Sequence, residues 1–287
     1  MGGTLYVVAT PIGNMGDMTS RGREVLASVD VIAAEDTRTS GVLLDKLGID
    51  GQKLVAYHKF NEEAGATGLV RMLEEGRSVA LITDAGTPCV SDPGSVLVRE
   101  AINAGVTVTA VPGASAVAAA ISVSGFNTVA FSFFGFLPRR DSEIADVMER
   151  IKGEYARVAV FYESPRRIKD SLKVIKKVLP EAELCLCNDL TKKFERIYRG
   201  SPASVLSQLD DNPDYAKGEY ALVLSLPPCA REEKESAPQS PELAILAAVL
   251  EGSTVRDAAA ELIRAGAFPK NEIKRAAIAL KERFEIE

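Results

Sequence analysis

The sequence is poor in the residues that bind metals. It has 287 residues with no tryptophan, one histidine and four cysteines, none of them in a CxxC pair. Zinc sites need clustered thiolates and imidazoles, so we expect no metal and reduced, structural cysteines. No apolar run approaches the roughly 20 residues of a membrane span. The N-terminus lacks a basic and apolar signal peptide, which leads us to expect a cytoplasmic protein with no membrane partner.

The length and the apolar content are typical of a globular protein with more than one domain. Apolar residues make up 46% of the chain, enough for a substantial core. The net charge of -6 is uneven, because Arg139 to Arg199 holds 15 Lys and Arg against 11 Asp and Glu. A local positive region attracts a phosphate backbone whatever the total charge. The plain alternative is a solvated helix face, since Lys169, Lys173 and Lys176 fit the outer side of an amphipathic helix.

Residues 1–122 alternate short apolar runs with helical patterns, as in a parallel α/β domain. The expected strands are Leu5–Ala9, Val31–Ala33, Leu54–Ala56, Val79–Ile82 and Val106–Val111. The expected helices are Ser20–Val29, Gly41–Leu47, Ala64–Glu75, Val96–Ala104 and Ser115–Val123.

Residues 123–228 predict a second α/β domain, in which short connections near Leu190 to Gly200 favour antiparallel pairing and a mixed sheet. The expected strands are Val129–Phe136, Ala156–Phe161, Glu183–Leu186, Phe194–Gly200 and Glu219–Leu226, and the expected helices are Asp141–Ile151, Pro165–Val178 and Pro202–Gln208. Residues 229–240 are polar and proline-containing, typical of a linker. Residues 241–287 predict three short helices with a helix-turn-helix-like pair, for which packing and nucleic-acid binding are equally open.

Three strands of the first domain end in corners of small residues, glycine and proline. The corners are Thr10–Asn14, Thr83–Pro88 and Pro112–Ala116. Carboxyl ends of parallel strands form the crevice in which ligands bind, so we expect the three corners to surround one small-molecule pocket.

The chemistry of the corners does not favour a dinucleotide. The first corner has no GxGxxG spacing, and Pro11 has no amide proton to offer a pyrophosphate. Asp84 in the second corner could receive an ammonium group or ribose hydroxyls. Ser115 and Ala116 begin a helix, where backbone amides suit a carboxylate. A ligand with an amino-acid head and a nucleoside fits this set.

Six ordered segments carry a resemblance to a known family. They are Leu5–Asn14, Ala34–Arg38, Thr83–Pro88, Val111–Ala116, Glu163–Arg167 and Leu190–Glu195. Together they closely resemble the ribosomal RNA small subunit methyltransferase I family, of the tetrapyrrole-methylase fold (class III SAM methyltransferases). The resemblance spans residues 4 to 226 and continues into the C-terminal helices.

This resemblance implies a fold, a cofactor and a reaction. The fold would be two α/β domains with the cofactor cleft between them and a small C-terminal helical segment. The reaction would move a methyl group from S-adenosylmethionine (SAM) to the ribose 2′-oxygen of a cytidine in 16S rRNA, leaving S-adenosylhomocysteine, and the enzyme would be a homodimer. By the resemblance, the cofactor would contact Pro11, Ile12, Gly13, Asp84, Ala85, Gly86, Thr87, Ser115, Ala116, Phe161, Tyr162, Leu190, Ala221, Leu222 and Val223.

Two groups of residues are candidates for the base that activates the hydroxyl. Glu35, Asp36 and Arg38 follow a strand, although acids also stabilise a helix N-terminus there. The second group comprises His58, Asn61 and Glu62. The family often has a second histidine where this chain has Phe60, and a lone histidine is more often structural.

Six cations of the second domain bear on the identity of the substrate and leave alternative functions open. Arg139, Arg140, Arg166, Arg167, Lys192 and Lys193 are expected to meet an RNA backbone, although a carboxylate-rich tetrapyrrole would also suit them. A precorrin or other tetrapyrrole C-methyltransferase and a diphthine-type methylase are therefore alternatives within the fold. A non-catalytic ribosome assembly factor that keeps the fold as a scaffold is a third.

Overall fold

The computed structural model describes residues 2–153, 156–227, 240–250, 252–266 and 268–284. The chain divides into two compact units, 1–227 and 228–287. Residues 229–239 of the expected linker lie outside the described residues, as does Cys229.

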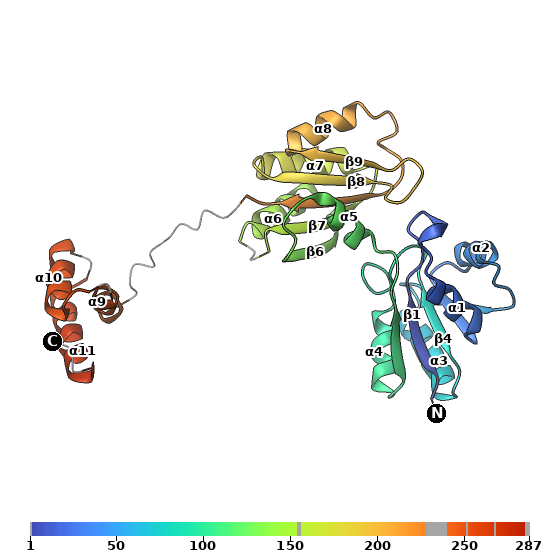
Figure 1. Ribbon diagram of the computed structural model, residues 1–287, viewed down its shortest axis with the longest axis horizontal. Helices are drawn as coiled ribbons and strands as arrows, with labels where there is room; N and C mark the ends of the chain where they lie inside the picture. Colours follow the sequence, from blue (N-terminus) through green and yellow to red (C-terminus); the bar gives the residue numbers. More distant parts are fainter. Residues whose placement is uncertain (1, 154–155, 228–239, 251, 267, 285–287) are drawn as a thin grey trace. The chain divides into compact units, whose positions relative to one another are not determined.

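The first sheet has five parallel strands in the order β3-β2-β4-β1-β5. Its neighbouring strands β1 and β4 are labelled in Figure 1. The strands are β1 (Thr4–Val8), β2 (Val31–Ala34), β3 (Lys53–Ala56), β4 (Val79–Ile82) and β5 (Thr107–Val111). The helices between them are α1 (Ser20–Ser28), α2 (Thr37–Leu47), α3 (Glu62–Glu74) and α4 (Ser95–Asn103). Because β4 lies beside β1 and β1 beside β5, the three strands that end in corners are neighbours in the sheet.

Both faces of this sheet are covered by helices. Leu5 and Leu81 pack with Leu69 of α3 and Leu97 of α4 on one face. Val8, Ile32 and Ile82 pack with Leu26 of α1 and Leu44 of α2 on the other. Every residue of β2 and β4 is consequently buried, which explains why these strands are uniformly apolar.

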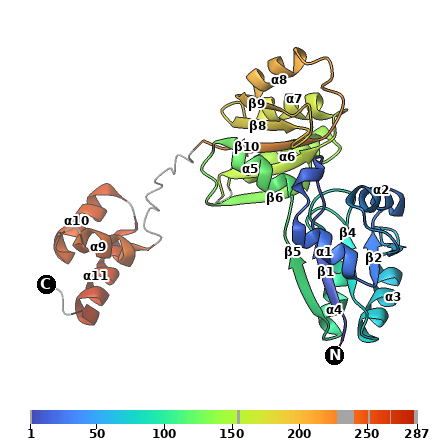
Figure 2. The ribbon, with the colours of Figure 1, turned by 45° about the vertical axis from the view of Figure 1, so that its right-hand side comes forward.

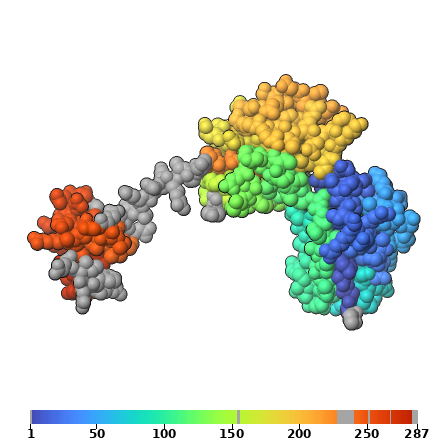
Figure 3. Space-filling view, in the orientation of Figure 1, coloured from blue at the N-terminus to red at the C-terminus, as the bar shows by residue number. Residues whose placement is uncertain are grey.

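The second sheet is mixed and has the order β6-β7-β10-β8-β9 (Figure 2). Its strands are β6 (Phe131–Phe136), β7 (Val158–Glu163), β8 (Glu183–Asn188), β9 (Arg196–Gly200) and β10 (Tyr220–Ser225). Only β6 and β7 pair in parallel, so the predicted mixed sheet is confirmed. In the space-filling view its residues form a lobe distinct from the blue-to-teal first domain (Figure 3).

Four helices cover the second sheet. On one face lies α5 (Ala116–Ser124), which packs Val117 and Ala120 against Val160, Cys185 and Val223. On the opposite face lie α6 (Asp141–Ile151), α7 (Ile168–Val178) and α8 (Pro202–Asp210). The helix α5 starts directly after the third corner, so the same corner ends the first sheet and begins the cover of the second.

The C-terminal unit consists of α9 (Pro241–Leu250), α10 (Val255–Ala265) and α11 (Lys270–Phe284), as predicted. Thr254 caps α10 by accepting a hydrogen bond from the Asp257 amide at 3.1 Å, and Gly266 ends it with φ 65°. Ile245, Val255 and Ile273 form its small core.

Element boundaries differ from the predictions in a few places. The predicted strand from Val129 begins at Phe131. The predicted helix from Pro165 begins at Ile168, because the Ser164 carbonyl first accepts the Arg167 and Ile168 amides in a turn. A short 3-10 helix at Met15–Asp17 was not predicted. Among the described residues, no helix is long and apolar enough to cross a membrane.

Candidate functional site

Hydrogen bonds hold the three corners against one another. The backbone of Thr10 donates to Gly86 O at 2.9 Å and accepts from the Gly86 amide at 3.0 Å. Thr10 Oγ1 also donates to Thr83 O at 3.1 Å, and Thr87 Oγ1 donates to Ala114 O at 3.0 Å. Gly86 has φ 85°, a backbone conformation that favours glycine. The corners therefore form one preassembled surface.

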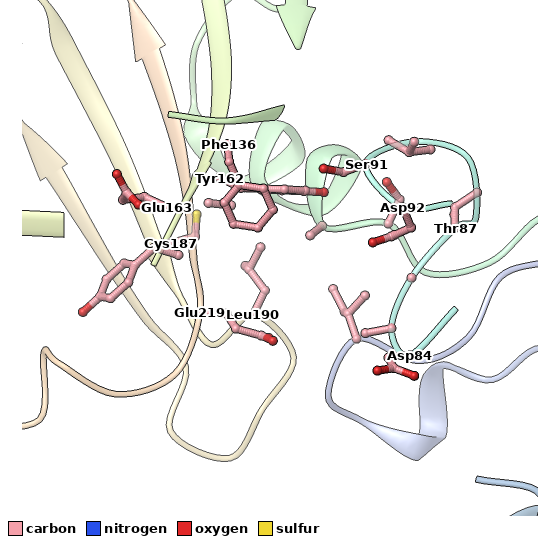
Figure 4. A pocket seen from close by; sticks show the side chains of 18 of the residues that line it. Asp84, Thr87, Ser91, Asp92, Phe136, Tyr162, Glu163, Cys187, Leu190 and Glu219 are labelled. Atoms are coloured by element: carbon pink, nitrogen blue, oxygen red, sulfur yellow. The ribbon is translucent and has the colours of Figure 1, made fainter. Parts of the chain in front are cut away.

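A cavity of about 430 Å³ lies between this surface and the second sheet (Figure 4). That volume is within the range of small-molecule sites, about 300–1,000 Å³. Its lining residues are Ile12, Glu35, Asp84, Ala85, Gly86, Thr87, Val90, Ser91, Asp92, Ser115, Ala116, Phe136, Tyr162, Glu163, Ser164, Pro165, Cys187, Leu190, Glu219, Tyr220 and Ala221.

The lining of the cavity is acidic. The described residues that line it include five with carboxyl side chains and no lysine or arginine. Two of the carboxylates have cationic partners: Glu163 accepts from Arg167 at 2.7 Å, and Glu219 accepts from Lys192 Nζ at 3.0 Å. Within the described part of the chain, Glu35, Asp84 and Asp92 form no ion pair. The pocket therefore favours a ligand that carries positive charge.

These three carboxyl groups influence one another. Burial raises the pKa of Glu35, and the neighbouring Asp92 and Asp84 raise it further. Burial likewise raises the pKa of Asp92, with Asp84 adding to the rise. Burial also raises the pKa of Asp84, although a hydrogen bond from the Asp36 amide at 3.3 Å opposes that rise. A cluster of like charges with raised pKa values in a cleft is typical of functional sites.

The second domain supplies an aromatic and apolar wall. Tyr162 packs edge-on against Phe133 and Phe136, with ring centroids 5.0 and 5.5 Å apart. Burial raises the pKa of Tyr162 to about 12, and Asp92 of the first domain contributes to the rise. Asp92 and Tyr162 therefore face the same interior from opposite domains. Leu190, Cys187 and Ala221 complete the wall.

Most of the expected cofactor residues line the cavity, but several do not. Ile12, Asp84 to Thr87, Ser115, Ala116, Tyr162, Leu190 and Ala221 line it, whereas Pro11, Gly13 and Val223 are outside its lining. Phe161 and Leu222 belong to the core on the opposite face of the second sheet, where Phe161 stacks on Phe134 at 5.1 Å. Side chains alternate along a strand, so Phe161 and Leu222 cannot share a face with their neighbours Tyr162 and Ala221. The expectation that they enclose the ligand is wrong for these two side chains.

The first group of candidate bases separates in the structure. Glu35 lines the cavity. Asp36 instead caps α2 by accepting the Arg38 amide at 2.8 Å, and it pairs with the Arg38 guanidinium at 2.7 Å. The Arg38 side chain is 90% exposed. Arg38 holds the pKa of Asp36 well below its usual range. Asp36 therefore stabilises the N-terminus of α2, as the alternative interpretation expects.

In the second group of candidate bases, the Asn61 and Glu62 side chains form hydrogen bonds with backbone groups. Asn61 accepts the His58 amide at 2.8 Å and donates to Ala56 O at 2.9 Å, which fixes the turn after β3. Glu62 accepts the Gly94 amide at 3.0 Å, at the residue just before α4. His58 Nδ1 is buried and has no hydrogen-bond partner among the described residues. His58 also lies close enough to Glu35 to lower the pKa of that carboxyl.

The six expected RNA-binding cations are not equally available. Arg140 pairs with Glu143, Arg167 with Glu163, and Lys192 with both Asp189 and Glu219. These three form ion pairs within the protein, although the Arg140 side chain is 76% exposed. Arg139, Arg166 and Lys193 are exposed and form no ion pair within the described ranges.

Sequence reasoning missed several lining residues, above all Asp92. This aspartate lies in the loop between β4 and α4, which also brings Val90 and Ser91 to the cavity. The Asp92-Pro93-Gly94 sequence signals a turn, but nothing local indicates that the turn folds back over the crevice. The described residues contain no group of three or more His, Cys, Asp or Glu arranged to hold a metal.

Comparisons with known proteins agree with one another. Residues 4–205 match the family described as Tetrapyrrole (Corrin/Porphyrin) Methylases. The chain is 40% identical to "Ribosomal RNA small subunit methyltransferase I" of Haemophilus influenzae, over 94% of this chain and 95% of the relative. The protein of the same name from Escherichia coli O157:H7 is 40% identical over 91% of this chain and 90% of the relative.

Solved structures with much lower identity share the fold. Diphthine synthase aligns with a TM-score of 0.61 at 16% identity, covering 78% of this chain and 90% of that one. Uroporphyrin-III-C-methyltransferase from Thermus thermophilus aligns with a TM-score of 0.53 at 21% identity, covering 78% and 94%. These similarities show a shared fold only. On the strength of the profile match and the 40% identical relatives, the chain belongs to the tetrapyrrole methylase family and, within it, to the ribosomal RNA small subunit methyltransferase I family.

Proposed function

We propose that this protein transfers a methyl group from SAM to the ribose 2′-oxygen of a cytidine in 16S rRNA. The observation that carries the proposal is an acidic cavity of nucleoside size, at the strand-end corners of a chain that belongs to this family. Membership of the family supports methyl transfer to rRNA, and the acidic cavity supports SAM as the methyl donor.

The residues present fit SAM. Its ammonium and sulfonium groups give it a net positive charge, which the unpaired carboxylates Glu35, Asp84 and Asp92 would attract. The apolar wall of Tyr162 and Leu190 suits an adenine ring. SAM supplies the methyl group as an electrophile, and the protein has to align donor and acceptor. After transfer the sulfonium charge is lost, so the carboxylates bind the product less strongly than the donor.

We infer that Glu35 is the base. A ribose hydroxyl becomes an effective nucleophile when a neighbouring group takes its proton. Glu35 faces the cavity, whereas Asp36, Asn61 and Glu62 are engaged in helix starts and a turn. Its raised pKa makes its carboxylate a stronger proton acceptor than an ordinary glutamate. His58, with its unpartnered Nδ1, would orient Glu35 or the ribose.

The acidic cavity argues against the tetrapyrrole alternative. A porphyrin-type acceptor carries several carboxylates, which Glu35, Asp84 and Asp92 would repel. A ribose hydroxyl is neutral and needs only a short reach into the cavity. Phosphates on either side of it would meet Arg139, Arg166 and Lys193, which lie outside the acidic lining.

We further propose that the enzyme acts as a homodimer in the cytoplasm, where small ribosomal subunits are found. The edge strand β6 supports a contact with a second copy, because its Phe131 and Phe136 are 45% and 62% exposed. Light scattering tests this state directly, with a mass of twice 30.7 kDa expected.

The test of function is methyl transfer with separate acceptors. Purified protein would be incubated with methyl-labelled SAM and either small subunits lacking the modification, free 16S rRNA, or uroporphyrinogen. We expect label in one of the two RNA acceptors and none in the tetrapyrrole. Label in the tetrapyrrole alone would establish the other activity. SAM binding that is undetectable by calorimetry, with ribosome binding retained, would favour the assembly factor.

A further inference from the structure

The loop between β8 and β9, residues 189–195, has a strained backbone. Asp189 has φ 53° and Thr191 has φ 66°, and neither is a glycine. The described residues include only one other non-glycine residue with positive φ, Cys89. Such conformations are unfavourable for residues with a side chain and persist where the surroundings enforce them, often at binding sites.

Several hydrogen bonds fix this loop. The Asp189 amide donates to Glu219 O at 2.9 Å, and the Lys192 amide donates to Asp189 O at 3.0 Å. Lys192 Nζ donates to Asp189 Oδ1 at 2.7 Å. The Thr191 amide donates to Glu195 Oε2 at 2.5 Å. The tip of the loop is therefore presented in one geometry.

One side of the loop belongs to the rim of the cavity. Leu190 is 8% exposed and lines the cavity. Lys192 lies against the first corner, since a Cβ built on Gly13 would come within 2.4 Å of Lys192 Cγ. The same loop thus touches the inside of the site and the corner of the opposite domain.

The other side of the loop presents an aromatic ring to solvent. Phe194 is 72% exposed, and the Nζ of Lys193 lies 5.4 Å from the centre of its ring. An exposed phenylalanine adds little to stability, yet the loop around it is strained and tightly hydrogen-bonded. Phe60 is also exposed beside a lysine, but its turn has no non-glycine residue with positive φ and is not part of the cavity lining.

We propose that Phe194 is a stacking platform for an unpaired base of the RNA substrate next to the methylated nucleotide, with Lys193 contacting the adjoining phosphate. Single-stranded RNA is recognised by aromatic rings that stack on bases and by cations that follow the backbone. A nucleotide whose ribose enters the cavity has to leave its own stack, and its neighbour then gains a partner in Phe194. This inference rests on the proposed function and adds a residue that contacts the RNA acceptor.

The absence of tryptophan from the chain gives a direct optical test. Phe194→Trp creates a protein with a single tryptophan at the proposed platform. Ile102→Trp is the matched control, because Ile102 is 60% exposed at the far end of α4 from the corners. On addition of small subunits lacking the modification, we expect strong fluorescence quenching for Phe194→Trp and little for Ile102→Trp. Equal responses of the two variants would overturn the inference.

The affinity for small subunits and the oligomeric state of the protein give a second test. Phe194→Ala should weaken filter binding of the subunits by about tenfold, from the loss of one base stack, while Phe194→Tyr retains it. The SAM affinity measured by calorimetry should not change. Unchanged subunit affinity would overturn the inference, as would conversion of a dimer to a monomer, which would place the ring between protein copies. These binding assays need no methyl transfer, so an inactive wild-type protein would count against the proposed function alone.

Discussion

Arg166 and Arg167 are adjacent, yet the structure assigns them opposite roles. The Arg167 guanidinium donates to Glu163 Oε2 at 2.7 Å, to Pro138 O at 2.6 Å and to Leu137 O at 3.0 Å. The Glu163 side chain is 1% exposed. Arg166 is exposed. Replacement of Arg167 by methionine should therefore destabilise the protein, whereas the same change at Arg166 should weaken RNA binding.

The magnitude follows from the carboxylate that is left behind. Without Arg167, the hydrogen-bond donors to Glu163 that remain among the described residues are the Ser171 hydroxyl and the Ser164 amide, both at 2.6 Å. Removing one partner of a buried ion pair costs about 3–5 kcal/mol. The Arg167 side chain is 31% exposed, so water replaces part of the interaction and we expect the lower end, about 3 kcal/mol. For a unit of this size that lowers the melting temperature by roughly 6–12 °C.

Scanning calorimetry on Arg167→Met and Arg166→Met measures the difference. The Arg166 variant should melt within about 2 °C of wild type, since exposed substitutions change stability by about 0.5 kcal/mol or less. Its affinity for small subunits should fall, with a shallower salt dependence. Glu163→Gln combined with Arg167→Met should recover part of the stability. A normal melting temperature for Arg167→Met, together with weakened RNA binding, would refute the assignment.

Four further predictions concern the cavity. Glu35→Gln should lower kcat by about 10²–10⁴-fold, far more than it weakens SAM binding through the loss of one attracting charge; a normal rate would remove Glu35 as the base. Glu35 must be ionised to accept a proton, so activity should rise with pH through its raised pKa, and Asp92→Asn should move that rise to lower pH by removing a neighbouring negative charge, as a pH series of kcat/KM would report. Asp84→Asn should weaken SAM binding about tenfold by calorimetry, whereas deletion of residues 241–287 should not change it, because unit 1–227 supplies the whole lining.

The sequence allowed the architecture and the position of the cavity to be predicted. Short uniform apolar runs such as Val79–Ile82 favour strands covered on both faces, and three of the strands of the first domain end at a corner with glycine or proline. Parallel strands then bring their carboxyl ends to one edge. The order β4-β1-β5 makes these corners neighbours, and the Thr10–Gly86 bridge joins two of them.

The inner surface of the site was less predictable, for two physical reasons. The direction of a strand side chain depends on a register that a one-residue shift reverses, which is why Phe161 and Leu222 were misplaced. Long-range contacts decide whether a charge is free, and Arg167 meets carbonyls about 30 residues away in sequence. Asp92 depends on the path of a loop, which local pattern does not determine.

If the acidic cavity aligns SAM with a cytidine ribose, the methyl group must be found on that ribose. Small subunits lacking the modification would be incubated with the protein and SAM, and their 16S rRNA digested to nucleosides for mass spectrometry. We expect 2′-O-methylcytidine with the wild-type protein and almost none with Glu35→Gln. A methyl group on a base, or on no nucleoside at all, would show that the cavity does not direct the methyl group to the ribose.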